Sequence, residues 1–189
     1  FMCVDHTGMI LTGFQYRRKP NDMNGEIGGV DDFNSDGKPD ILWRNTVTGE
    51  NAVWFMDVDH TGIIRTSLQY ILTLSDLNWK MCGTDDFNGD GKPDILWRNY
   101  STGDNAVWFL GVDHTGIIRT GFQYLLKLND MKWEIGRADD FNSEGKPEIL
   151  WRKTITEETA VGLVDVDYTG LSWPQRQNYT RIVCLTCKD

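Results

Sequence analysis

The chain has 189 residues, of which 40% are hydrophobic, and it carries eight Trp and a formal net charge of −9. This apolar content excludes a disordered chain, and the acidity argues against nucleic acid, whose binding proteins present a basic face. No apolar stretch is long enough to span a bilayer, so membrane insertion is not expected.

A nine-residue segment occurs three times along the chain. It reads DFNSDGKPD at 32–40, DFNGDGKPD at 86–94 and DFNSEGKPE at 140–148. The offset is 54 residues each time, and Trp43, Trp97 and Trp151 follow at the same spacing. A fixed period of this length predicts repeated supersecondary units stacked on one another.

Each repeat predicts four short strands, as residues 78–128 illustrate. A mixed segment at 79–84 leads into the loop, and a segment rich in β-formers follows at 94–99. A turn at 101–104, an apolar run at 106–110, a second turn at 113–116 and an extended stretch at 117–126 complete the unit. Four strands joined by tight turns predict one antiparallel sheet covered on both faces, as in a propeller blade.

The predicted fold is therefore all-β, with about three and a half blades. Residues 1–24 are expected to supply strands three and four of a partial blade, because 1–8 match 55–62. Complete blades are expected at 25–78, 79–132 and 133–189, the last with a C-terminal tail. The chain thus opens in the middle of a repeat, as a fragment or processed product would.

The repeated nonamer has the residue pattern of a cation loop. Oxygen-bearing side chains occupy positions one, three, five and nine, a Lys carbonyl is available at position seven, and a Gly permits the sharp turn. An all-oxygen set in a flexible loop favours Ca²⁺ over Mg²⁺ and disfavours zinc or copper. The predicted ligands are Asp32, Asn34, Asp36, Lys38 and Asp40; Asp86, Asn88, Asp90, Lys92 and Asp94; and Asp140, Asn142, Glu144, Lys146 and Glu148.

Two alternatives to a calcium loop are considered. An EF-hand would need Glu at position twelve, where the first loop has Trp43, so that motif is rejected. The second alternative, that each loop is an Asp/Asn/Gly turn that binds no ion, is left open. The third loop is the weakest, since Glu144 and Glu148 each add a methylene that should push a carboxylate outward. Two calcium ions are predicted, with a third left open.

The loop followed by Pro-Asp-Ile-Leu-Trp-Arg-Asn resembles the FG-GAP/VCBS repeats of integrin-α-like and fungal-lectin-like propellers. The resemblance implies that the loop joins the first and second strands of each blade. It also implies that sugar sites can lie between blades. The candidate carbohydrate residues are Trp43, Arg44, Trp97, Arg98, Trp151 and Arg152. The alternative is that these Trp pack between blades, because aromatic side chains dominate core energetics.

The four cysteines ignore the repeat. Cys184 and Cys187 form a lone CxxC, for which zinc is disfavoured, and a disulfide from the C-terminal segment to Cys3 is left open. No pattern for nucleophilic catalysis is present, and the loops account for the paired carboxylates. An enzyme is therefore not predicted.

We expect a calcium-stabilised extracellular binding module, secreted or on the cell surface. Carbohydrate recognition is placed first. A protein-binding or adhesion scaffold, or a structural repeat region of a larger secreted protein, is the alternative. Further blades, in a longer chain or a homo-oligomer, are expected to complete the ring, since a closed propeller has four to eight blades.

Overall fold

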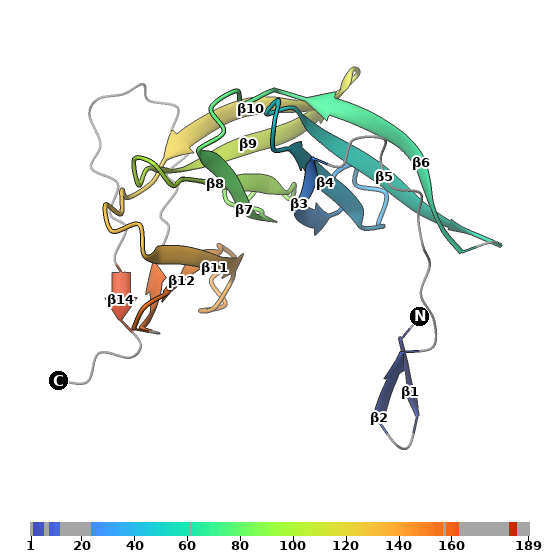
Figure 1. The fold of residues 1–189 in the computed structure, drawn as a ribbon. Helices are drawn as coiled ribbons and strands as arrows, with labels where there is room; N and C mark the ends of the chain where they lie inside the picture. The colour runs from blue at the N-terminus through green and yellow to red at the C-terminus, as the bar shows by residue number, and fades with distance from the viewer. Residues whose placement is uncertain are drawn as a thin grey trace.

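The computed structural model describes residues 2–5, 8–11, 24–60, 62–156, 158–162 and 182–184, with side chains described only within 24–162. A two-stranded hairpin comes first in the chain, and three four-stranded antiparallel sheets follow it (Figure 1). No helix occurs in these described ranges, and so none could cross a membrane. The prediction of an all-β fold built from four-stranded antiparallel sheets is confirmed.

Each sheet is a meander in which consecutive strands pair. The first sheet holds β3 (Gly25–Asp31), β4 (Asp40–Asn45), β5 (Asn51–Asp59) and β6 (Gly62–Ile71). The second holds β7 (Trp79–Asp85), β8 (Asp94–Asn99), β9 (Asn105–Asp113) and β10 (Gly116–Tyr124). The third holds β11 (Trp133–Asp139), β12 (Glu148–Lys153), β13 (Thr159–Gly162) and β14 (Ile182–Cys184). We call them the first, second and third blades.

The N-terminal hairpin repeats the register of a blade's last two strands. β1 (Met2–Asp5) pairs with β2 (Gly8–Leu11), with Met2 opposite Leu11 and Asp5 opposite Gly8. In the first blade, Met56 lies opposite Arg65 and Asp59 opposite Gly62. The positions differ by 54 residues at every pair, so the hairpin has the pairing of β5 and β6.

The blades are arranged as in a propeller, with their first strands side by side. β7 lies against both β3 and β11, and β10 approaches β6 at the outer side. Each first strand carries a bulge at the same repeat position, occupied by Gly28, Cys82 and Gly136. A Cβ at Gly28 would meet the Met81 side chain, so β3 approaches β7 closely at this position, and a larger residue would require Met81 to move.

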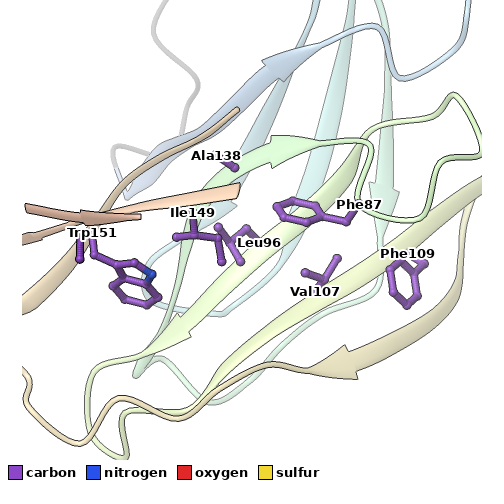
Figure 2. Close-up of a cluster of buried hydrophobic side chains, with 8 residues drawn as sticks. Phe87, Leu96, Val107, Phe109, Ala138, Ile149 and Trp151 are labelled. Atoms are coloured by element: carbon purple, nitrogen blue, oxygen red, sulfur yellow. The ribbon is translucent and has the colours of Figure 1, made fainter. Parts of the chain in front are cut away.

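Two apolar clusters lie between the blades. Each blade has a Trp face, which carries the Trp of its second strand, and an opposite Phe face, which carries the Phe of its loop. The Phe face of the first blade (Phe33, Leu42, Val53) packs on the Trp face of the second (Ile95, Trp97, Trp108, Leu110, Ile117). The Phe face of the second blade (Phe87, Leu96, Val107, Phe109) packs on the Trp face of the third (Ala138, Ile149, Trp151, Ala160) (Figure 2).

Burial of these side chains holds the array together. Fully burying one side chain of this size contributes about 1.5–3 kcal/mol, and both clusters draw on strands from two blades. The cysteine pairing that the sequence leaves open is not tested, because the side chains of Cys3 and Cys184 and all of Cys187 lie outside the described residues.

Candidate functional site

The three nonamer loops lie between the first and second strands of their blades, joining β3 to β4, β7 to β8 and β11 to β12. This is the position that the resemblance implied. The Gly at loop position six has a positive φ in all three: 82° at Gly37, 79° at Gly91 and 79° at Gly145. The sharp turn expected of this glycine is therefore present in each loop.

The first acid of each loop is the centre around which the backbone wraps. Asp32 Oδ1 accepts a hydrogen bond from the Asp36 amide at 3.0 Å, and Asp32 Oδ2 accepts one from the Gly37 amide at 2.8 Å. Asn34 Oδ1 also accepts from the Asp36 amide, at 2.9 Å. These bonds fold the loop so that the side chains at positions one, three and five face the same short stretch of backbone.

The second and third loops repeat this pattern. Asp86 accepts from the amides of Asp90 and Gly91 at 3.1 and 2.7 Å. Asp140 accepts from the amides of Glu144 and Gly145 at 3.1 and 2.8 Å. The backbone of the third loop is thus the same as that of the other two despite its Glu substitutions.

The acid at position nine is a structural link as well as a candidate ligand. Asp40 is fully buried, and its two oxygens accept from the amides of Phe33 at 3.2 Å and Met56 at 2.9 Å. Asp94 does the same with Phe87 at 3.1 Å and Leu110 at 2.9 Å. Each carboxylate therefore ties its loop to the third strand of its own blade.

Burial has a clear electrostatic effect on these two acids. Desolvation raises the pKa of Asp94 to about 7, and repulsion from Asp90 and Asp86 acts in the same direction against the amide bonds. Desolvation also raises the pKa of Asp40, with smaller contributions from Asp36 and Asp32. The loop carboxylates are therefore close enough to repel one another, a cost that a bound cation would remove.

The third loop corrects one expectation. Glu148 is not pushed outward by its extra methylene, because it is buried and accepts hydrogen bonds from the Phe141 amide at 3.0 Å and from Asn142 Nδ2 at 2.8 Å. Glu144 is exposed, as are Asp36 and Asp90 at the same position of the other loops. The expected outward displacement is therefore wrong for Glu148, and exposure alone does not distinguish Glu144 from its equivalents.

The donor chemistry of the loops fits a hard divalent cation. A carboxylate has about four lone-pair sites, so the acids that accept amide bonds keep acceptor capacity. Among residues 24–162 as described, however, no three His, Cys, Asp or Glu side chains are grouped closely enough to hold a metal by themselves. A cation in these loops would therefore depend on the Asn side chain and the Lys carbonyl together with the acids.

The Trp–Arg pairs lie mostly inside the array. Trp97 and Trp151 are buried in the two interfaces, and Arg44 and Arg98 are buried beside them. Only Arg152 is exposed, while Trp43 is half-buried. A sugar needs an accessible ring face, so carbohydrate binding by Arg44, Trp97, Arg98 and Trp151 is not supported, and the alternative of packing between blades holds for these four.

These pairs form stacks that cross from one blade to the next. The Arg44 guanidinium lies 5.1 Å from the Trp97 ring centroid, and Arg98 lies 5.2 Å from the Trp151 ring. Trp97 in turn packs 4.8 Å from Trp108, whose other neighbour is Arg119 at 4.9 Å. Arg44 and Arg98 thus each stack on the tryptophan of the following blade, whereas Arg119 stacks on a tryptophan of its own blade.

The buried arginines also hold the segments that connect the blades. Arg44 donates to the carbonyls of Leu74 at 2.9 Å and Asp76 at 3.3 Å. Arg98 donates to Leu128 and Asp130 at 3.3 and 3.4 Å. A guanidinium suits this role because its planar fork donates in several directions while its face stacks on a ring.

One further contact between blades was not predicted. The Gln69 side chain on β6 donates from Nε2 to the Ile117 carbonyl at 2.8 Å and accepts from the Ile117 amide at 3.0 Å. It thereby pairs with the backbone of β10 in the next blade. The recurrence of Gln at position 123 was the available signal, although nothing in it indicates a partner 48 residues away.

Two segments of the chain match the sequence model of the FG-GAP repeat, residues 24–56 and 77–110. They cover the first two strands, the loop and most of the third strand of the first blade, and the corresponding part of the second. FG-GAP repeats form propeller blades, in agreement with the sheets described above. Comparison with curated proteins and with solved structures finds no match.

Proposed function

We propose that the chain is a propeller-type module, secreted or on the cell surface, that binds a protein partner and does not act as an enzyme. FG-GAP repeats suggest binding or adhesion modules. The observation that carries the proposal is where the aromatic residues lie. Arg44, Trp97, Arg98 and Trp151 are buried between blades, whereas the exposed aromatic side chains Tyr70, Phe122 and Tyr124 are on the outer strands β6 and β10.

The last strands of the first and second blades, β6 and β10, and the residues just after them carry a repeated row of exposed apolar side chains, which we call the outer row. Leu68, Tyr70 and Leu72 form this row on the first blade. Phe122, Tyr124 and Leu126 occupy the same repeat positions on the second. Exposed apolar side chains gathered in this way mark interaction sites, and Tyr and Phe are enriched in protein interfaces.

The test compares the outer row with a matched control. The immobilised chain would be assayed against a panel of purified extracellular matrix proteins and against a glycan array. We expect binding to a matrix protein that Tyr124→Ser weakens at least tenfold and that Val112→Ser, an exposed position outside the row, leaves unchanged. Equal binding by both variants would refute the assignment of the outer row.

A second candidate, carbohydrate binding, is supported by one observation. The Tyr124 ring lies 6.3 Å from Trp79 and 5.8 Å from Phe122, so three aromatic rings gather beside the first interface. Their faces could stack on the apolar face of a sugar. Glycan-array signals that Tyr124→Ser abolishes, without binding to the protein panel, would favour this candidate over the first.

Calcium is part of the proposal as a stabilising ion. In the first loop Asp32, Asn34, Asp36, the Lys38 carbonyl and Asp40 would hold it, with the corresponding residues in the second. Desolvation raises the pKa of Asp94 to about 7, and repulsion from Asp90 and Asp86 adds to this rise; the ion would offset that repulsion. The third loop makes the same amide bonds to its first acid, but two of its candidate ligands, Asn142 and Glu148, are hydrogen-bonded to each other. We therefore propose two ions, and a third with lower affinity.

A further inference from the structure

The first and third blades lie at the two ends of the row of blades. Each exposes one face whose equivalents are buried at the interfaces between blades. On the Phe face of the third blade, Phe141 is 47% exposed, whereas its equivalents Phe33 and Phe87 are 3% and 1% exposed. Leu150 and Val161 on the same face are half-buried, while Leu42, Leu96, Val53 and Val107 are fully buried. The third blade thus carries an uncovered Phe face.

The Trp face of the first blade is uncovered in the same way. Ile27, which lies opposite Trp43, is 59% exposed. Ile41, Trp43 and Trp54 are half-buried, whereas their equivalents Ile95, Trp97 and Trp108 in the second blade are buried. Both end faces therefore consist of residue types that are buried at the interfaces within the chain.

The interfaces within the chain show what each end face fits. Between the first and second blades, a Phe-Leu-Val set packs on an Ile-Trp-Trp set. Phe141, Leu150 and Val161 are the same Phe-Leu-Val set at one end, and Ile41, Trp43 and Trp54 are the same Ile-Trp-Trp set at the other. The arginine contact has its counterpart too, since Arg152 corresponds to Arg44 and Trp43 to Trp97.

We propose that the Phe face of the third blade in one copy of the chain packs on the Trp face of the first blade in a second copy. The contact repeats the interface between consecutive blades, with Arg152 over the partner's Trp43. It joins two different faces, so it is a head-to-tail contact that closes into a ring or continues as a filament.

For the 189-residue chain, the number of blades favours a ring of two copies. Each copy contributes three four-stranded sheets and one two-stranded hairpin, so two copies bring together six complete blades. Propellers have about four to eight blades, a range that six satisfies and that nine, from three copies, exceeds. In such a ring both end faces of both copies are covered, which removes all four apolar faces from water.

The test is the mass of the 189-residue chain in solution, measured by light scattering after size-exclusion chromatography over the micromolar range. We expect twice the 21.7 kDa of one copy. Phe141→Asp and Ile27→Asp, one on each end face, should each give the mass of one copy. Ile155→Asp, at an exposed turn of the third blade away from both faces, should stay dimeric. Circular dichroism would check that each variant is folded.

Mixing the two monomeric variants tests the head-to-tail arrangement. The intact Phe face of the Ile27→Asp chain can pack on the intact Trp face of the Phe141→Asp chain, so the mixture should form dimers. A wild-type chain that stays monomeric would overturn the proposal, as would folded face variants that stay dimeric or a mixture that stays monomeric. Because Ile27 and Phe141 are on different blades, failure of one variant to fold leaves the other as a test.

Discussion

The second strand of the first blade and that of the second blade have the same sequence, DILWRN, but different surroundings. In β8 all six residues are buried, whereas in β4 only alternate residues are. Ile41, Trp43 and Asn45 are the half-buried ones, and Ile41 and Trp43 point to the Trp face. The difference between the strands arises because the first blade covers the Trp face of the second, while the corresponding face of the first is open.

The comparison shows that burial in this protein depends on the neighbouring blade. The Phe-face residue of the same strand, Leu42 or Leu96, is fully buried in both blades, because a following blade covers it each time. Identical side chains should therefore contribute differently to stability. The predictions below test this difference, and those on the blade interfaces use the Ile27→Asp background, in which the proposed dimer is absent.

The largest expected effect separates Trp97 from Trp43. Trp97→Ala removes a fully buried indole and should lower the free energy of unfolding by about 3–5 kcal/mol. Trp43→Ala removes a half-buried one and should cost about 1–2 kcal/mol. Urea unfolding followed by circular dichroism measures both. Equal losses would mean that the first blade is covered in solution even in this background.

The arginines extend the comparison to the third blade. Arg98→Lys keeps the charge but removes the fork that donates to the Leu128 and Asp130 carbonyls, so it should cost about 2 kcal/mol. Arg152→Lys changes an exposed side chain and should stay within about 0.5 kcal/mol. The same unfolding measurement applies, and a cost at Arg152 matching that at Arg98 would refute the role of stacking between blades.

The repeat explains why the blades were predictable from sequence. Turn residues and β-forming segments recur at a fixed spacing, and each blade is made of neighbouring strands joined by tight turns. The loop backbone was predictable for the same reason, since Asp32 and Gly37 interact within six residues. Local interactions of this kind are present in the sequence pattern itself.

The roles of single side chains were less predictable, because they depend on contacts between distant strands. Asp40 has the sequence pattern of a ligand, but its bond to the Met56 amide requires the register of β4 against β5. The sequence alone is equally consistent with Trp97 stacking on a sugar, because the burial of its ring depends on the position of the preceding blade. The burial of Glu148 likewise depends on where Asn142 lies.

A comparison of the second and third loops tests the calcium proposal. A loop with a dissociation constant of about 10⁻⁴–10⁻³ M is typical of extracellular modules. Calcium at about ten to a hundred times that value should add about 1.4–2.7 kcal/mol per loop. Asp90→Ala should remove one bound ion, whereas Glu144→Ala should change little, because the extra methylene of Glu144 does not suit a cage that fits Asp at this position.

Native mass spectrometry counts the ions, and thermal unfolding in calcium and in chelator measures the stabilisation. Asp36→Ala serves as the matched change in the first loop and should resemble Asp90→Ala. Identical melting temperatures in calcium and chelator would contradict the assignment of an ion to any loop. A loss of one ion in Glu144→Ala would show that the third loop binds calcium like the other two.

The smallest effect concerns loop position four, where the first and second loops differ. Ser35 has a φ of 60° and Gly89 a φ of 76°. A non-glycine residue in this left-handed region costs about 1–2 kcal/mol, while glycine loses about 0.5–1 kcal/mol more backbone entropy on folding. Ser35→Gly should therefore stabilise the chain by about 0.5 kcal/mol, and Gly89→Ser should destabilise it by a similar amount. Ser143, with a φ of 61°, offers the same test in the third loop. If Ser35→Gly lowers the unfolding midpoint in urea, the serine hydroxyl stabilises the loop by more than its backbone conformation costs.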